Sequence, residues 1–158
     1  MLRLSKLTDY AVVVLLRLAE AEGVQTTPCL AGATGIAEPT VAKVLKSLGN
    51  AGLVESQRGA RGGYRLARPL SGLPLSEVIV AIDGPIALTA CVDSAAGSCD
   101  AEWICPVRGR WDPVNEVIRQ ALAGVTLADL ARPPVAPQDR CSQTQPPPMA
   151  APAALAAE

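Results

Sequence analysis

A mainly α-helical fold with one small β-hairpin is the fold class that the sequence predicts. Apolar residues recur at helical spacing in several segments, and residues 54–67 have the pattern of a strand, a glycine-rich turn and a second strand. The 158 residues fit one compact domain, or a small domain with an arm. The hydrophobic fraction of 49% includes no Phe, two Trp and two Tyr, so burial against a second subunit would help such a core.

Composition also indicates where in the cell the protein works and which kind of partner it binds. There is no apolar run of about 18 residues, which a membrane span would need, and no cleavage signature follows the N-terminal residues. We therefore expect a cytoplasmic protein whose five cysteines are reduced, metal-binding or redox-active. Residues 1–70 carry nine Lys/Arg and five Asp/Glu, whereas residues 71–158 carry five and ten. A basic front half suits a polyanion-binding head, although a chance distribution of surface charge would look the same.

Three helices are expected in the first fifty residues. The first, about residues 7–21, is apolar nearly all round in its middle, as is typical of a buried helix. Residues 26–28 supply a hydroxyl cap and a first-turn proline for a short second helix, which ends near Gly35. Pro39 then opens a third helix through about residue 50. The spacing of the second and third helices predicts a helix-turn-helix.

The third helix has one apolar and one polar face. The apolar face comprises Val41, Val44, Leu45 and Leu48. The polar face comprises Thr40, Lys43, Ser47 and Asn50, with Lys46 at its edge. In a helix-turn-helix such a polar face enters the major groove of DNA, so Thr40, Lys43, Lys46 and Ser47 are the expected base and backbone contacts. The alternative is an ordinary amphipathic helix with a solvated face.

The hairpin that follows favours the DNA-binding interpretation. Its tip, residues 58–63, contains three glycines and two arginines and is expected to be flexible and cationic. A basic hairpin directly after a helix-turn-helix is the wing of a winged helix, which reaches phosphates or the minor groove. The expected wing contacts are Arg58, Arg61 and Arg65.

The rest of the chain is expected to form a helix over residues 75–82, a cysteine loop and a helix over residues 112–123. Asp112 and Pro113 suggest a cap and a first-turn proline for the last of these. Its apolar stripe is formed by Val114, Val117, Ile118, Ala121 and Leu122. A capping box from Thr126 to Asp129 suggests one final turn, and a Pro- and Ala-rich disordered tail follows. The predicted division is a head (1–84), a loop (85–111), a helix with a last turn (112–132) and a tail (133–158).

The loop carries Cys91, Cys99 and Cys105, separated by seven and five residues. Soft thiolates suit iron–sulfur clusters, zinc or copper(I), but structural zinc sites usually contain closely paired cysteines, which are missing here. A long loop containing Gly and Ser is better suited to a bulkier cluster. A thiol–disulfide switch and three thiols without a ligand remain alternatives, and Cys29 and Cys141 are poorer candidates. Because the chain has no His, a fourth ligand must be a cysteine, a carboxylate or an external group.

Several segments together resemble the Isc/Suf-type iron–sulfur regulators. They are LRLSKLTDYA (2–11), EPTVAKVLK (38–46), RGGYRLA (61–67) and the three spaced cysteines. The opening segment, WDPVN (111–115) and GVTLAD (124–129) most resemble the branch that regulates Suf cluster assembly. The resemblance covers about residues 1–131. It implies a winged-helix homodimer with a long C-terminal dimerisation helix (112–123), a cluster held by Cys91, Cys99 and Cys105, and repression of cluster-assembly or related stress genes.

One departure concerns the fourth ligand. Some members of that family use a histidine three residues after the last cysteine, where this chain has Arg108. Others use a carboxylate from the first helix of the partner subunit, and the matching residue is Asp9, although an acidic residue there also stabilises a helix N-terminus. The local carboxylates are the further alternatives: Asp93, Asp100 and Glu102. A carboxylate ligand would make the two-iron or four-iron cluster labile.

The expected mechanism places two recognition helices one turn of double-stranded DNA apart on a pseudo-palindromic operator. A bound cluster would order the loop against the partner's first helix, and its loss to oxygen, nitric oxide or iron shortage would alter operator affinity. The alternative is a cluster-free winged-helix regulator that responds to cysteine oxidation, nitric oxide or another ligand. An enzyme is not expected, because the chain has no His, no nucleophile–base pair and no phosphate-binding motif.

Overall fold

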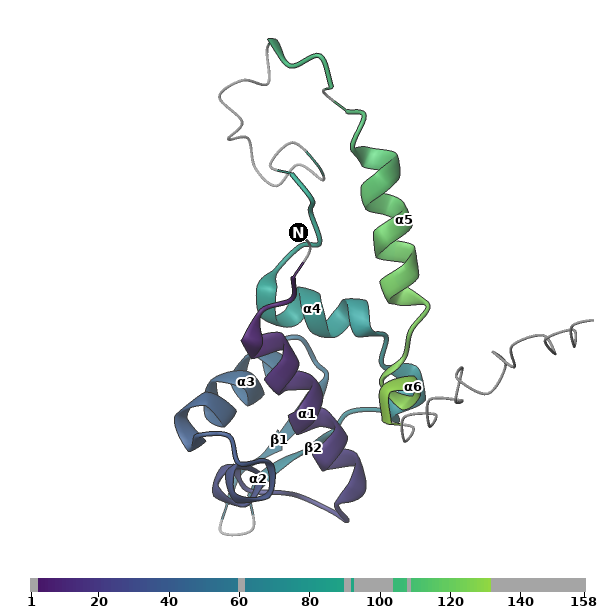
Figure 1. Ribbon diagram of the computed structural model, residues 1–158. Helices are drawn as coiled ribbons and strands as arrows, with labels where there is room; N and C mark the ends of the chain where they lie inside the picture. Colours follow the sequence, from purple (N-terminus) through teal and green to yellow (C-terminus); the bar gives the residue numbers. More distant parts are fainter. Residues whose placement is uncertain (1–2, 60–61, 90–91, 93–103, 108, 132–158) are drawn as a thin grey trace, which may run out of the picture.

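The computed structural model describes residues 3–59, 62–89, 92, 104–107 and 109–131, and it has the predicted mainly helical fold with a small hairpin (Figure 1). The elements are α1 (Lys6–Glu20), α2 (Thr27–Thr34), α3 (Glu38–Asn50), β1 (Val54–Gln57), β2 (Gly63–Leu66), the 3₁₀ helix η1 (Leu70–Gly72), α4 (Leu75–Asp83), α5 (Asp112–Ala123) and α6 (Leu127–Ala131). The first three helices and the hairpin form a head, α4 packs on α1 and α3, and α5 rises away from them.

Helix α1 lies through the centre of the head. It begins where the Ser5 hydroxyl accepts a hydrogen bond from the Thr8 backbone N–H (3.1 Å). Ala11, Val14 and Leu15 are fully buried on one face, whereas Val13 is 38% exposed, so the expectation of a helix buried all round was wrong on that side. The bounds match the expected helix to within one residue.

The helix-turn-helix forms as the local signals predicted. The Thr26 hydroxyl accepts a hydrogen bond from the Cys29 N–H (3.4 Å), and Pro28 occupies the first turn of α2. Gly35 ends α2 in the left-handed conformation (φ 70°), which a residue with a side chain adopts less readily. The predicted apolar face of α3 is wholly buried: Val41, Val44, Leu45 and Leu48.

The hairpin is antiparallel, with Val54 opposite Leu66 and Gln57 opposite Gly63. A second connection joins it to the segment between α1 and α2, where Gln25 and Tyr64 exchange two backbone hydrogen bonds of 2.8 and 2.7 Å. The strand β2 is therefore hydrogen-bonded on both edges, which fixes the base of the wing to the rest of the head.

Two wing glycines serve a purpose that differs from the expected flexibility. A Cβ on Gly63 would lie 2.4 Å from the Gln25 carbonyl oxygen, and one on Gly62 would lie 2.5 Å from that of Gln57. Both distances are too short for any side chain. These positions require glycine because backbone segments meet closely there, which is a reason that the sequence analysis did not give.

The chain returns to the head after α5. The Leu127 N–H donates to the Leu73 carbonyl (2.9 Å), and Leu127 itself is fully buried. The predicted capping box is present, since the Thr126 N–H donates to Asp129 Oδ2 (3.0 Å) and the Asp129 N–H donates to Thr126 Oγ1 (3.4 Å). The expected Asp112 cap was wrong by one position: Trp111 is the cap residue, no side-chain cap bond forms there, and Asp112 is already helical.

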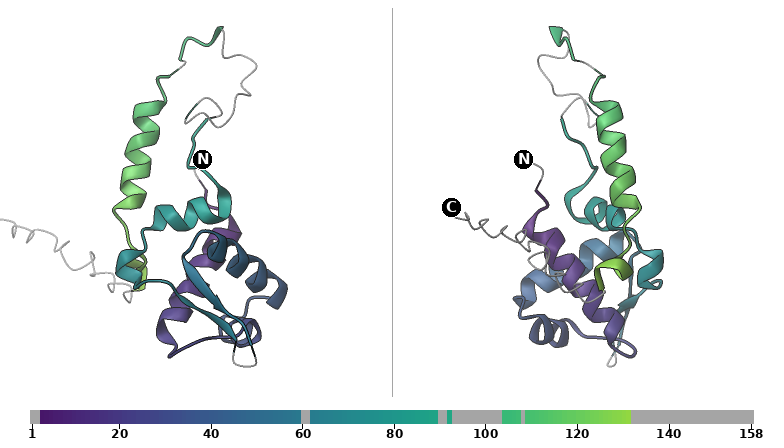
Figure 2. Two further views of the ribbon diagram at one scale, coloured as in Figure 1. Left: turned by 180° about the vertical axis from the view of Figure 1, so that it is seen from behind. Right: turned by 45° about the vertical axis from the view of Figure 1, so that its right-hand side comes forward.

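Helix α5 is largely exposed in the single chain. Figure 2 shows that its start and the hairpin lie at opposite ends of the molecule. On its apolar stripe, Val114 and Val117 are 46% and 66% exposed, whereas Ile118 and Leu122 are half-buried. No helix within the described part of the chain has the length and hydropathy that a membrane span requires.

Candidate nucleic-acid interface and cysteine segment

The polar face of α3 is accessible along its length. Lys43, Lys46 and Asn50 are exposed, while Thr40 and Ser47 are half-buried at the border with the apolar face. The buried face fixes the helix on α1 and α2, so these polar side chains project from a rigid element. This is the geometry that a recognition helix needs.

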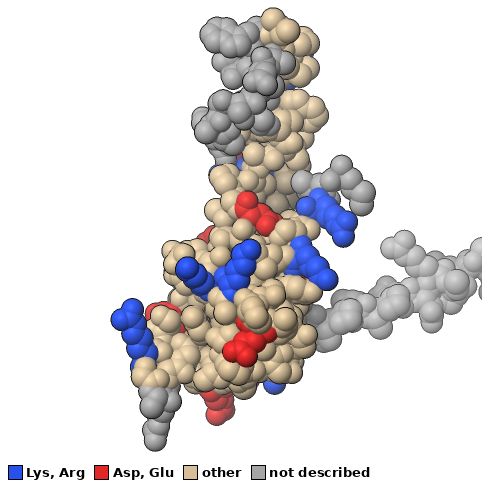
Figure 3. All heavy atoms as spheres, turned by 90° about the vertical axis from the view of Figure 1, so that its left-hand side faces the viewer, with Lys and Arg blue, Asp and Glu red and all other residues tan. Residues whose placement is uncertain are grey.

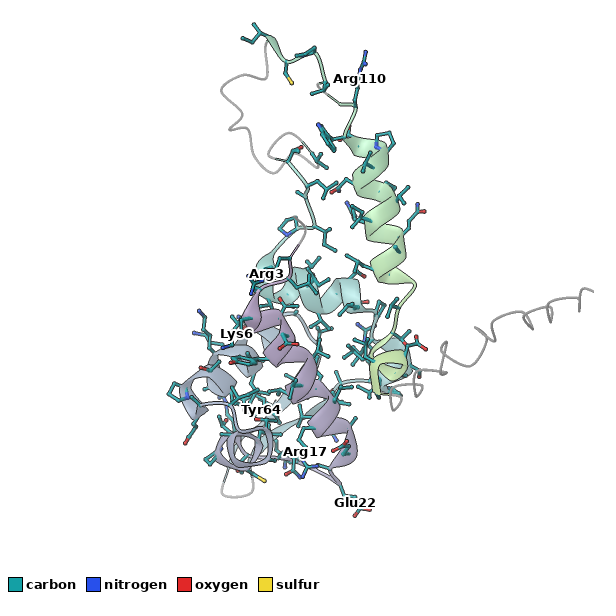
Figure 4. The ribbon with its side chains drawn as sticks, viewed as in Figure 1. Arg3, Lys6, Arg17, Glu22, Tyr64 and Arg110 are labelled. Atoms are coloured by element: carbon teal, nitrogen blue, oxygen red, sulfur yellow. The ribbon has the colours of Figure 1, made fainter. Side chains whose placement is uncertain are left out.

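Lys and Arg side chains are exposed on the head together with acidic ones. Figure 3 shows Lys and Arg side chains spread over one face of the molecule, with Asp and Glu side chains interspersed among them. Two further exposed cations, which sequence analysis did not single out, are Arg3 just before α1 and Lys6 at its first residue (Figure 4). Lys6 Nζ lies 5.4 Å from the centre of the Tyr10 ring, and Tyr10 raises the pKa of Lys6 above its ordinary value. Lys6 is therefore charged at physiological pH.

The expected wing arginines differ in their surroundings. Arg58 is exposed, and Arg61 lies outside the described residues. Arg65 is bound to Glu55 on the opposite strand, with its Nε and Nη2 atoms 2.9 and 2.7 Å from Glu55 Oε2. Both side chains are more than half exposed, so the pair adds little stability, but it occupies the Arg65 guanidinium in the free protein.

The expected metal ligands are only partly within the described residues. Cys105 is a half-buried free thiol, and Asp9 is exposed in the first turn of α1. The other candidates lie outside: Cys91, Cys99, Asp93, Asp100, Glu102 and Cys141, as does Arg108, which stands in place of the histidine of some relatives. Most of the predicted ligand set therefore lies outside the described residues, among which no group of three potential metal ligands occurs. Cys29 is exposed, with its Sγ atom 3.4 Å from Gln25 Oε1.

One end of the segment that leads into the cysteine loop is tied to α1. Asp83, the last residue of α4, accepts a 2.7 Å hydrogen bond from the Thr8 hydroxyl and a 3.4 Å bond from the Ser5 N–H, both at Oδ2. Desolvation raises the pKa of Asp83, but the hydrogen bonds from Ser5 and Thr8 outweigh it, so that this pKa lies below its ordinary value. The carboxylate form holds the two helices together.

The same segment is tied to α5 a few residues later. Asn115 is 2% exposed and uses both ends of its amide: Nδ2 donates to the Ile86 carbonyl (2.9 Å), and Oδ1 accepts from the Leu88 N–H (3.0 Å). Sequence analysis missed the roles of Asn115, Asp83 and Thr8. The available signal was an amide side chain within an apolar helical stripe.

Comparison with known proteins identifies the family. Residues 4–133 match the sequence profile of Rrf2, described as an iron-dependent transcriptional regulator. The chain belongs to the Rrf2 family. It is thus a DNA-binding transcriptional regulator and not an enzyme, and the predicted resemblance to iron–sulfur regulators of this kind is confirmed at the level of the family.

Individual Rrf2 relatives cover most of the chain. Protein aau3 of Rhizobium meliloti (strain 1021) is 34% identical over 132 residues, which are 83% of this chain and 86% of that protein. The HTH-type transcriptional regulator NsrR of Geobacillus kaustophilus (strain HTA426) is 29% identical over 131 residues, covering 82% of this chain and 89% of NsrR.

Two solved structures share the Rrf2 winged-helix fold. CymR, described as the global cysteine regulator of B. subtilis, superposes with a TM-score of 0.62 at 27% identity, covering 83% of this chain and 97% of CymR. T. potens IscR superposes with a TM-score of 0.56 at 28% identity, covering 82% of this chain and 85% of IscR. Both similarities extend beyond the head to most of the described chain.

Proposed function

We propose that this Rrf2 protein is a cytoplasmic, homodimeric repressor that senses iron–sulfur cluster status and controls Suf-type cluster-assembly genes. The observation that carries the proposal is the attachment of residues 83–88, which lead into the cysteine loop, to both α1 and α5. A change in the loop therefore has a physical route to the DNA-reading head. The description of the family as iron-dependent supports the proposal, as does similarity to NsrR and IscR.

The DNA contacts that we propose follow from the two exposed surfaces of the head. Thr40, Lys43 and Ser47, with Lys46 at their edge, would meet base edges and phosphates in the major groove. The wing arginines would meet phosphates or the minor groove: Arg58, Arg61 and Arg65. In a two-fold dimer, two such heads require a pseudo-palindromic operator with half-sites about one helical turn apart.

The proposed dimer rests on the apolar stripe of α5. Val114 and Val117 are exposed in the single chain, and Trp111 just before the helix is 40% exposed. An apolar stripe that is exposed at Val114 and Val117 and only half-buried at Ile118 and Leu122 is typical of a subunit interface. A second copy of α5 would bury it in a two-fold arrangement.

The proposed cofactor is a two-iron or four-iron cluster held by Cys91, Cys99 and Cys105, with Asp9 of the partner subunit as the fourth ligand. The donor chemistry fits, because three thiolates suit iron–sulfur clusters and Cys105 is a free thiol. When bound, such a cluster supplies a group that is sensitive to oxygen, nitric oxide and iron supply. Asp9 offers an exposed carboxylate, which is a weaker ligand for iron than thiolate and favours easy release.

A cluster-free regulator is the second candidate function. The similarity to CymR, described as a global cysteine regulator, supports this second candidate, and the matched region spans 97% of the CymR chain. In that case the same cysteines would respond by oxidation or by binding another ligand.

Anaerobic purification from iron-replete cells, followed by visible and paramagnetic-resonance spectroscopy, tests the cluster. Sulfur-to-iron charge-transfer bands are expected for the wild type and should vanish in Cys99→Ala, which should also derepress a reporter under the suf-type promoter. Cys29→Ala is the matched control and should keep both properties. Colourless wild-type protein, or repression that survives Cys99→Ala, would favour the cluster-free regulator.

A further inference from the structure

We propose that Asp83 and Asn115 are positioning residues that hold residues 83–88 as a fixed connector between α1 and α5, and that this connector sets how strongly the cysteine loop affects operator binding. The inference rests on the proposed function, since it concerns how the state of the loop reaches the DNA-reading head. It assigns the coupling to two side chains that are neither proposed ligands nor proposed DNA contacts.

The first anchor joins the end of α4 to the start of α1. Asp83 and Thr8 are 75 positions apart in sequence, yet their side chains form a 2.7 Å hydrogen bond. Thr8 is fully buried, so its hydroxyl is fixed by packing. Ser5, the cap of α1, donates its N–H to the same Asp83 oxygen (3.4 Å). Asp83 thereby holds the first turn of α1, which also carries Asp9.

The second anchor joins the connector to α5. Asn115 forms hydrogen bonds with backbone atoms of Ile86 and Leu88, so these bonds do not depend on the side chains at those two positions. Asn115 is the one buried residue among the described residues of α5. Without the Asn115 amide, the Ile86 carbonyl and the Leu88 N–H would each lose their hydrogen-bond partner, and an unpaired polar group away from water costs free energy. The segment is therefore held at fixed register along the helix.

The two anchored points, Asp83 and the backbone of Ile86 and Leu88, are only a few residues apart in the chain, so the segment between them is short. A displacement of α5 relative to the head pulls on Leu88 and Ile86, which lie at the start of the predicted loop (85–111), and is passed to Asp83. From Asp83 it reaches Thr8 and α1, which packs directly against the recognition helix α3. Figure 1 shows the start of α1 and the segment after α4 side by side. Coupling through a hydrogen-bonded, packed path of this kind is expected to respond to loss of either anchor.

Two variants with matched controls test the connector. Asn115→Leu removes both amide bonds and keeps the branched shape and the number of side-chain heavy atoms. Gln120→Leu is its control, because within the described residues that amide bonds Glu116 on the same helix. Thr8→Val removes the hydroxyl and keeps the shape of a buried side chain. Its control is Thr34→Val, which loses a hydroxyl bond of the same length, 2.7 Å, within α2.

The measured quantity is the ratio of operator Kd between the cluster-free and the anaerobically reconstituted protein, obtained by fluorescence anisotropy. Asn115→Leu and Thr8→Val should each shrink the wild-type ratio at least about threefold. The cluster absorbance and the cluster-free Kd should stay within about twofold of wild type. Both controls should keep the wild-type ratio. If Asn115→Leu does not fold, Thr8→Val decides.

The outcomes separate the two levels of the argument. A wild-type ratio of one overturns the proposed function, and the connector with it. A wild-type ratio that differs from one and is unchanged in both variants overturns the connector alone. A readout without any cluster is amide hydrogen exchange of the cluster-free protein. Asn115→Leu should speed exchange at the Thr8 and Asp9 amides, whereas Gln120→Leu should not, and equal rates in both variants would contradict the link.

Discussion

Glu55 holds the guanidinium of Arg65 across the wing, with Nη2 and Oε2 2.7 Å apart. The carboxylate lies on the surface that we expect to face DNA phosphates, where it both occupies a cation and repels the backbone. If Arg65 contacts DNA as we propose, the pair is expected to lower the operator affinity that Arg65 supplies, which gives the first prediction.

Glu55→Gln should tighten operator binding by freeing Arg65. The slope of log K against log salt should become steeper by about one, the value for one added phosphate contact. Anisotropy titrations at several salt concentrations measure it. Glu20→Gln is the control, because its partner Arg17 lies in the last turn of α1, and it should leave the slope unchanged. Unchanged binding by Glu55→Gln would remove Arg65 from the proposed contacts.

Gly63→Ala should destabilise the head, because the new Cβ would clash with the Gln25 carbonyl and with the Val24 side chain. Overpacking of this kind costs about 1–3 kcal/mol in the free energy of unfolding. Thermal unfolding measures the loss. Gly72→Ala is the control, since its Cβ would meet only Arg68 Cδ at 3.8 Å, an ordinary contact. Equal Tm values for the two variants would contradict the prediction, because they would mean that the Gln25 segment moves aside at no cost in stability.

Asp83→Asn should change how stability depends on acid pH. The folded protein holds the pKa of Asp83 below its ordinary value, so its contribution is present above the unfolded pKa, about 3.9, and is lost as pH falls through the lower folded pKa. The free energy of unfolding of the wild type should therefore exceed that of Asp83→Asn near neutral pH, and the difference should shrink below about pH 4.

Denaturant titrations of both proteins from neutral to acid pH measure that difference. Asp129→Asn serves as a comparison, since Asp129 is also an acidic hydrogen-bond acceptor, but it accepts from Thr126, only three residues away. A constant gap between wild type and Asp83→Asn at every pH would contradict a role for the Asp83 charge.

Val117→Lys should weaken the dimer without harming the fold of the subunit. The side chain is 66% exposed in the single chain, so a charge there leaves the head core untouched but would be buried in the proposed interface. Sedimentation velocity should show a shift toward monomer. Ala123→Lys adds the same charge at an exposed position away from the apolar stripe and should stay dimeric. A Val117→Lys protein that sediments like wild type would move the interface elsewhere.

Local sequence signals predicted most of the fold. The cap at Thr26, the left-handed Gly35 and the apolar face of α3 act over a few residues, so periodicity and cap chemistry located the helix-turn-helix closely. The single misplaced cap, Asp112, differs by one position, because the helical backbone already includes that residue. Composition at the wing predicted a turn but not why Gly63 is needed, since the obstructing Gln25 carbonyl belongs to a distant segment.

The candidate site was predicted less completely. The polar face of α3 follows from periodicity, and its exposure agrees with the expectation. The links made by Asp83 and Asn115 join residues 75, 27 and 29 positions apart, and no local pattern reports such pairs. The Glu55–Arg65 pair depends on the strand register, which sequence alone did not fix. Long-range polar partners, rather than helices, are what the structure adds.

The packed core of the head runs from Ala11 to Val78 and closes with Leu127, and its fully buried members include no residue of the described parts between 84 and 126. The packing of the DNA-reading head therefore does not depend on the residue types in the described parts between residues 84 and 126. If that stretch is the detector that we propose, a stretch of different length or with different donor atoms is compatible with the same reading head and with the same attachments at Asp83 and Asn115.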